Sequence, residues 1–200
     1  MGKKITFMSG IYQLEGLFRQ STSGKGVVIT HPHPLYGGDM HNSVVTAMTQ
    51  VYQQHDYTTL RFNFRGTGNS QGTHADGLGE EEDVRAALAH LADFGIRHLN
   101  LAGYSFGAWV NAHLACQHDG IEAMVMVSPP AAFMDFGSIA GLDCLNLIIT
   151  GSRDEIAPSG LINQLIPKWN PQARFEIIEG ADHFYGRHLD RLKEILAYFI

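Results

Sequence analysis

Apolar residues with strand-like spacing alternate along the chain with apolar residues at helical spacing. Residues 3–8 and 11–19 have strand-like spacing and are separated by Ser9-Gly10, which predicts an opening antiparallel hairpin. The continuous run at 26–30, Gly-Val-Val-Ile-Thr, is typical of a buried parallel strand. Helical spacing follows and predicts a helix near 41–54, from Val44, Val45, Met48, Val51 and Tyr52.

The same alternation continues to the last residue. Further strands are predicted at 58–64, 98–102, 123–127, 145–150 and 174–178. Helices are predicted at 80–94, 106–117 and 158–166, and over the terminal segment that carries Leu189, Leu192, Leu196 and Phe199. Strands that alternate with helices predict an α/β fold, with a mostly parallel sheet of about seven or eight strands and helices on both faces. Active sites in such sheets lie beyond the carboxyl ends of the strands, so candidate chemistry is expected in segments that follow strands.

Composition narrows the class of protein. A chain of 200 residues with 44% hydrophobic and 17% charged residues is expected to form one domain over residues 1–200. The net charge of −6 and the scattered basic residues argue against nucleic-acid and membrane-surface partners. No apolar run approaches the length of a membrane span and the start lacks a signal-peptide pattern, so the expected location is the cytoplasm. Cys116 and Cys144 do not make a disulfide scaffold.

The segment Gly103-Tyr104-Ser105-Phe106-Gly107 lies between a predicted strand and a predicted helix. A sharp strand-to-helix turn lifts a serine hydroxyl above the sheet edge and requires small flanking residues, which explains both glycines. The N-terminus of the following helix adds partial positive charge where an oxyanion would develop. Ser105 is therefore the candidate nucleophile, and an idle serine in a tight turn is the alternative.

A serine hydroxyl needs a neighbouring base, which a third group holds in place. His183 follows the strand predicted at 174–178 and is the expected base, although the chain has eleven histidines. Asp154 follows the strand predicted at 145–150 and is the expected acid, with the adjacent Glu155 as runner-up. Asp182 neighbours the base in sequence, but its side chain is expected to point away.

These segments resemble the α/β-hydrolase superfamily from about residue 25 to the end. Three further segments are similar to a bacterial subgroup of small, lidless serine hydrolases: His31-Pro32-His33-Pro34-Leu35-Tyr36-Gly37-Gly38, Arg61-Phe62-Asn63-Phe64-Arg65-Gly66-Thr67-Gly68 and Gly77-Leu78-Gly79-Glu80. The resemblance implies Ser105, Asp154 and His183 as a catalytic triad. It implies no defined substrate, because the subgroup is mostly described only as hydrolases or esterases.

The oxyanion hole is expected to use two backbone N–H groups. One is that of Phe106, the residue after the nucleophile. The second should come from the loop at 31–38, where Pro32 and Pro34 cannot donate, so His33 or Leu35 is the candidate. His31 and His33 are considered as metal ligands, but no further ligands follow at a recognisable spacing, so no metal is expected.

Two other loops bear on the site. The run 66–72 is rich in glycine but lacks the third glycine of a dinucleotide-binding motif, so it is interpreted as a turn and no cofactor is expected. Arg65 either anchors that turn or meets an acidic substrate group. Only residues 128–143 are available where a lid could be inserted, which predicts an open cleft. Its acyl pocket is expected to be lined by Tyr36, Phe133, Met134 and Phe136, although the last three could instead cover the core.

The predicted activity is hydrolysis of a carboxylic ester or thioester through an acyl-enzyme intermediate. The expected partner is a small acyl substrate, and the protein is expected to be a monomer or a small homo-oligomer. One alternative is a peptidase or amidase with the same triad. The other is an inactive binding protein that retains the fold.

Overall fold

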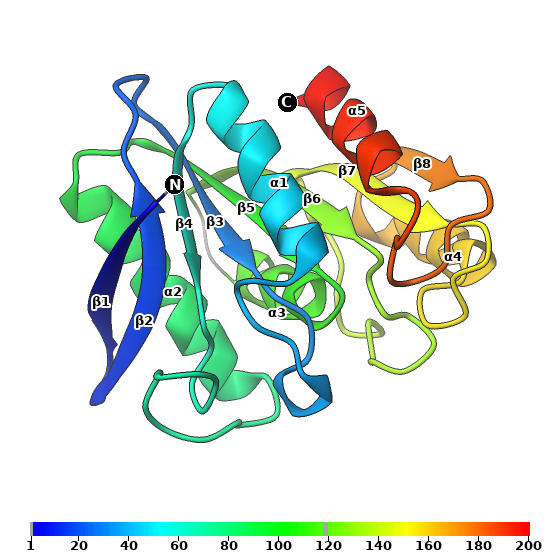
Figure 1. Cartoon of the computed structure of the whole chain (residues 1–200). Helices are drawn as coiled ribbons and strands as arrows, with labels where there is room; N and C mark the ends of the chain where they lie inside the picture. Colours follow the sequence, from blue (N-terminus) through cyan, green and yellow to red (C-terminus); the bar gives the residue numbers. More distant parts are fainter. Residues whose placement is uncertain (1, 118–119) are drawn as a thin grey trace.

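An eight-stranded sheet forms the centre of the molecule, with strand order β1-β2-β4-β3-β5-β6-β7-β8 (Figure 1). The structure is a computed structural model and describes residues 2–117 and 120–200. The strands are β1 (Lys3–Ser9), β2 (Tyr12–Arg19), β3 (Lys25–Thr30), β4 (Thr58–Phe62), β5 (His98–Tyr104), β6 (Ile121–Val127), β7 (Leu145–Gly151) and β8 (Arg174–Ile178). β1 and β2 pair antiparallel, as do β2 and β4, and every later pairing is parallel.

Helices cover both faces of this sheet. They are the short 3₁₀ turn η1 (Pro34–Tyr36) and the helices α1 (Ser43–Gln54), α2 (Leu78–Asp93), α3 (Phe106–Ala115), α4 (Ser159–Trp169) and α5 (Leu189–Phe199). In Figure 1, α1 and α5 lie in front of the sheet, and α2, α3 and α4 lie behind it. Two clusters of buried apolar side chains fill these two interfaces. The mostly parallel sheet with helices on both faces, expected from the alternating pattern, is therefore confirmed.

Several boundaries differ from the sequence predictions by a few residues, and contacts in the structure explain three of them. β4 ends at Phe62 rather than at residue 64, because the Phe64 N–H leaves the sheet and donates to His31 Nε2 at 3.0 Å. α2 begins at Leu78 because the Glu80 carboxylate accepts the Gly77 N–H at 2.8 Å. α4 continues through Pro167 to Trp169, whose side chain is 1% exposed, so burial of the indole favours one more turn.

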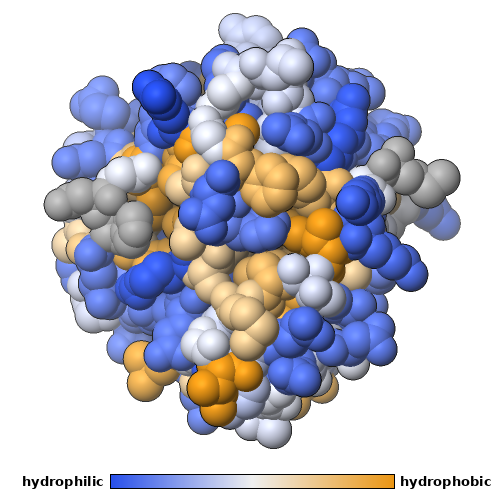
Figure 2. All heavy atoms as spheres, turned by 90° about the vertical axis from the view of Figure 1, so that its left-hand side faces the viewer, coloured by the Kyte–Doolittle hydropathy of each residue, from blue (hydrophilic) through white to orange (hydrophobic). Residues whose placement is uncertain are grey.

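The β1–β2 hairpin forms one edge of the sheet and is less covered than its centre. Figure 2 shows the molecule from this side, with apolar side chains gathered toward the middle of a mainly hydrophilic face. Met8 and Ile11 in the hairpin are 56% and 82% exposed. Over the two stretches that the structure describes, no helix combines the length and the apolar character that a membrane crossing requires.

Candidate active site

Ser105 lies at the junction of β5 and α3 in a strained backbone conformation, with φ 54° and ψ −119°. The residues two positions before and after it, Gly103 and Gly107, have no room for a side chain. A Cβ atom on Gly103 would lie 2.6 Å from Ala108 Cα, and one on Gly107 would lie 2.5 Å from Thr30 Oγ1. The Ser105 N–H donates to the Val127 carbonyl oxygen of β6 at 2.9 Å, which fixes the turn. The surrounding structure thus holds the Ser105 backbone in a conformation that a serine would not adopt without strain.

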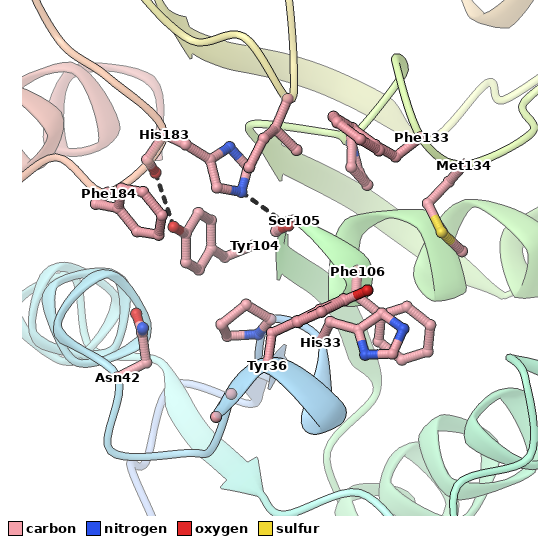
Figure 3. A pocket seen from close by; sticks show the side chains of 15 residues that line it. His33, Tyr36, Asn42, Tyr104, Ser105, Phe106, Phe133, Met134, His183 and Phe184 are labelled. Carbon is pink, nitrogen blue, oxygen red and sulfur yellow. Dashed lines mark hydrogen bonds between the residues drawn. The ribbon is translucent and has the colours of Figure 1, made fainter.

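Figure 3 shows His183 reaching Ser105 across the end of the sheet. His183 Nε2 lies 3.0 Å from Ser105 Oγ, and its Nδ1 lies 2.9 and 3.0 Å from the two oxygens of Asp154. All three residues are buried, with exposures of 4% to 7%. Serine, imidazole and carboxylate therefore form one hydrogen-bonded chain, in which a proton can pass between Ser105 and His183.

Asp154 is held on every side by donors. Its Oδ1 accepts the N–H groups of Ile156 and Ala157 at 3.0 and 2.7 Å, and its Oδ2 accepts the Ser128 hydroxyl at 2.7 Å. Burial by itself raises the pKa of this carboxyl, but hydrogen bonds from His183 and these donors outweigh it, so the pKa is lowered. Asp154 is therefore kept ionised next to the imidazole.

The other two acid candidates stand away from His183. Glu155 is exposed, and His183 Nδ1 is within hydrogen-bond distance of Asp154 alone among the described residues. Asp182 Oδ1 accepts the N–H groups of Phe184 and Tyr185 at 3.0 and 3.1 Å, so its side chain organises the loop.

Sequence reasoning missed three supporting residues. Ser128 Oγ, which donates to Asp154, also lies 2.7 Å from the hydroxyl of Tyr185, and both residues are fully buried. The Tyr104 hydroxyl donates to the His183 carbonyl oxygen at 2.7 Å. Ser128 follows β6, so the rule that chemistry follows strands could have singled it out.

His31 fixes the start of the loop at residues 31–38 through both nitrogens of its ring. His31 Nδ1 lies 2.7 Å from the Pro32 carbonyl oxygen, and Nε2 accepts the Phe64 N–H at 3.0 Å. Burial lowers the pKa of His31 to about 4, so its ring is neutral at pH 7. Both nitrogens are thus committed to protein groups, and no cluster of three or more metal-ligating side chains occurs in residues 2–117 and 120–200.

The two candidates for the second oxyanion donor differ in availability. The Leu35 N–H donates to His33 Nδ1 at 3.3 Å, and the Leu35 side chain is 70% exposed. The His33 N–H has no acceptor within the described parts of the chain. Phe106 is the first residue of α3, so its own N–H has no partner inside the helix. His33 and Phe106 are therefore the available pair.

A cavity of about 560 Å³ opens over Ser105. Tyr36, Phe133 and Met134 line it as expected, and Figure 3 shows the last two across the cavity from Tyr36. It is lined by Pro32, His33, Tyr36, Gly37, Gly38, Asn42, Tyr104, Ser105, Phe106, Pro130, Phe133, Met134, Ile156, His183 and Phe184. Among the described residues that line it there is no aspartate, glutamate, lysine or arginine.

Phe136 does not line this cavity, and the expectation that it would is wrong. Its side chain is 2% exposed, and its ring packs against Trp169 with a centroid separation of 5.0 Å. The indole of α4 therefore draws Phe136 into the core, which was the alternative role for this residue. Phe184, from the loop that carries His183, lines the cavity instead and is 68% exposed.

Arg65 has an anchoring role. Its guanidinium is 7% exposed and forms ion pairs with Asp83 at 2.8 Å and with Glu82 at 3.0 Å. Its own N–H donates to Asp83 Oδ2 at 2.9 Å, so helix α2 ties down the start of the turn at residues 66–72. The segment 128–143 after β6 contains neither a helix nor a strand, so it forms no separate cap domain.

Comparison with known proteins identifies the class. A model of the Alpha/beta hydrolase family matches residues 27–192, so the chain belongs to this family. An uncharacterized protein of Rickettsia prowazekii is 34% identical over 185 residues, which cover 86% of this chain and 78% of the relative.

Two solved structures are similar over almost the whole chain. An alpha-beta serine hydrolase homologue from Coxiella burnetii is 32% identical, with a TM-score of 0.92 and coverage of 98% of this chain and 96% of that one. A serine hydrolase without a lid from Xanthomonas campestris is 28% identical, with a TM-score of 0.90 and coverage of 98% and 92%. These relatives indicate hydrolase activity for the chain.

Proposed function

We propose that the protein is a serine hydrolase that cleaves a carboxylic ester or thioester with an uncharged, largely apolar acyl group. The observation that carries this proposal is the hydrogen-bonded chain from Asp154 through His183 to Ser105, which ends in a cavity whose described lining has no aspartate, glutamate, lysine or arginine. The likeness to lidless serine hydrolases supports the same conclusion.

In this proposal Ser105 Oγ attacks the carbonyl carbon while His183 Nε2 accepts its proton. The N–H groups of Phe106 and His33 stabilise the tetrahedral oxyanion, at the N-terminus of α3 where partial positive charge gathers. His183 then donates the proton to the leaving alcohol or thiol, which departs and leaves an acyl-enzyme. Water repeats the sequence and releases the carboxylic acid, and Asp154 orients the imidazole throughout.

The lining of the cavity argues for the acyl group. Tyr36, Phe133, Met134 and Phe184 offer apolar contacts, and no cation is available among the described lining residues to pair with a substrate carboxylate. A carboxylate moved into such surroundings would lose its hydration without compensation. An ester whose acyl group carries a second, free carboxylate should therefore be a poor substrate.

A fluorophosphonate probe tests the nucleophile. We expect the wild-type protein to be labelled on the peptide that contains Ser105, and the Ser105→Ala variant to remain unlabelled. A folded wild-type protein that does not react would contradict the proposal and favour an inactive binding protein.

The acyl group is tested with matched activated esters. We expect butyrate to be hydrolysed at least about tenfold faster than the hemisuccinate of the same chain length, because an unpaired carboxylate costs more than about 1.4 kcal/mol to bury. The matching thioester and anilide place thioesterase and amidase activity on the same scale. Equal rates for butyrate and hemisuccinate would rule out the proposed acyl selectivity.

A further inference from the structure

A second cavity, of about 470 Å³, lies on the front face of the sheet. It shares no lining residue with the active-site cleft, although His41 and Asn42, neighbours in sequence, line one cavity each. Its lining comes from Gly2, the hairpin, β4, α1 and the loop before α1, and comprises Gly2, Lys4, Leu17, His41, Thr46, Thr49, Gln50, Gln53 and Arg61. In Figure 1, α1 lies in front of the sheet, whereas α2 lies behind it. We call this hollow the sheet-face cavity.

Strand register places two cations on its floor. Lys4 in β1 pairs with Leu17 in β2, and Leu17 pairs with Arg61 in β4. Residues paired directly across neighbouring strands point to the same face of a sheet, so Lys4, Leu17 and Arg61 form one row. One strand separates the two cations, which puts their backbones about 10 Å apart. Both long side chains can therefore reach one bound group between them.

Arg61 lacks the partner that a half-buried arginine usually has. Its Nη1 donates to Thr46 Oγ1 at 2.7 Å, and within the described residues no carboxylate lies within 4.0 Å of its guanidinium. Burial lowers the pKa of Arg61, and Asp39 offsets this effect only in part. A cation that has lost water and found no counter-ion gains free energy from an anion.

The nearby acidic groups are already occupied. Asp39 Oδ1 accepts the His41 N–H at 2.8 Å, and Glu15 accepts the N–H groups of Asn63 and Asn69 at 2.7 to 2.9 Å. Neither residue lines the cavity. In a chain with 20 acidic and 14 basic residues, a hollow with two cations and no lining carboxylate among the described residues is unusual.

We propose that the sheet-face cavity binds a small polar molecule through a phosphate group, held by Arg61 and Lys4. A phosphate presents several acceptor oxygens, so it can take two parallel bonds from the arginine fork while the lysine contributes its point charge. The Gln50 amide supplies a neutral donor on the α1 wall. The volume of the sheet-face cavity exceeds that of a phosphate ion. Its polar wall would suit hydroxyl groups on the organic part of a phosphate ester. This inference is independent of the proposed hydrolase activity.

Titration with inorganic phosphate and glycerol 3-phosphate tests the site, with glycerol as the uncharged match. Chloride keeps the ionic strength constant, because exposed charges are screened by salt. Isothermal calorimetry measures affinity, and amide NMR shifts report location. We expect saturable binding of both phosphates, with the largest shifts in α1 and around Arg61, and no binding of glycerol.

Three variants make the assignment specific. Arg61→Gln should weaken phosphate binding at least about tenfold, since a hydrogen bond to a charged group is lost. Lys4→Gln should weaken it severalfold. Lys3→Gln is the matched control, because it removes the same charge from the neighbouring residue on the opposite face of β1 and should leave affinity unchanged.

Circular dichroism establishes that each variant is folded. Arg61→Lys retains the charge and should keep more of the affinity for phosphate than Arg61→Gln does. Wild-type affinity in folded Arg61→Gln would overturn the proposal. So would equal losses in Lys3→Gln and Lys4→Gln, which would indicate a diffuse charge effect. Binding to vesicles that contain phosphatidic acid, without binding to either soluble phosphate, would point to a lipid surface and would also overturn it.

Discussion

The molecule has two hollows of similar size and opposite lining. The cleft of about 560 Å³ is apolar at its walls, and its charged group, Asp154, is buried behind it and fully hydrogen-bonded. The sheet-face cavity of about 470 Å³ has cations in its floor, and Arg61 finds no carboxylate there among the described residues. The carboxylate of Asp154 is therefore not exposed in the cleft, whereas Lys4 and Arg61 line the sheet-face cavity, where a ligand can contact them.

Their places in the fold explain the difference. The cleft lies where the carboxyl ends of β5, β6, β7 and β8 meet, so loops distant in sequence bring Ser105, Ser128, Asp154 and His183 together. The sheet-face cavity is lined by the antiparallel β1–β2 hairpin and by α1, which packs on β3 and β4 from the front. The first position assembles reacting groups, and the second leaves strand side chains uncovered.

The largest expected effect separates the two hollows directly. Ser105→Ala should lower ester hydrolysis at least a hundredfold, because it removes the proposed nucleophilic oxygen. Its affinity for inorganic phosphate should stay unchanged, and Arg61→Gln should show the converse. Steady-state rates and calorimetry on the same preparations measure both. Loss of both functions in either folded variant would mean that the hollows are coupled.

A second experiment compares two arginines four residues apart. Arg65→Gln should lower the free energy of unfolding by about 3–5 kcal/mol, because it leaves the buried Asp83 carboxylate without its partner. Arg61→Gln should change it by less than about 1 kcal/mol, since no ion pair is broken. Urea unfolding measures both values. Similar losses in the two variants would show that Arg61 is structural and would weaken its assignment to a ligand.

The smallest effect concerns the charge behind the cleft. Ser128→Ala removes the donor to Asp154 Oδ2 and should lower kcat/KM about tenfold, the value of a hydrogen bond to a charged group. The hydrogen bonds around Asp154 lower the pKa of its carboxyl, so removing one raises that pKa. Asp154 then takes up its proton at higher pH, and the acidic limb of kcat/KM moves upward.

Tyr185→Phe is the graded control for this effect. It removes the hydroxyl that lies 2.7 Å from Ser128 Oγ but leaves the contact between Ser128 and Asp154. We expect the acidic limb to move in the same direction by less. A drop in rate without any movement of the limb, in either variant, would indicate that Ser128 only packs the loop.

The sequence made the order of strands and helices predictable, because apolar spacing records which face each element buries. Ser105, Asp154 and His183 could be chosen because each follows a predicted strand, and the structure brings them within hydrogen-bond distance. Their catalytic roles remain the proposal that labelling of Ser105 tests.

Other features depended on contacts that spacing does not record. Phe136 was misplaced because Trp169, 33 positions later, takes its ring into the core. Tyr185 was missed because its hydroxyl contacts a serine 57 residues away. The row of Lys4, Leu17 and Arg61 follows from a pairing register across three strands, and nothing in the local pattern of the hairpin fixes that register with β4.

The backbone of Ser105 has a consequence for how this protein can change. A non-glycine residue at φ 54° and ψ −119° costs on the order of 1–3 kcal/mol, and glycine relieves that cost. At position 105, glycine would therefore favour stability, whereas the proposed activity requires serine. Selection for heat resistance alone would favour glycine at position 105 and would discard the hydroxyl, so a thermostabilised descendant must be screened for turnover at every round.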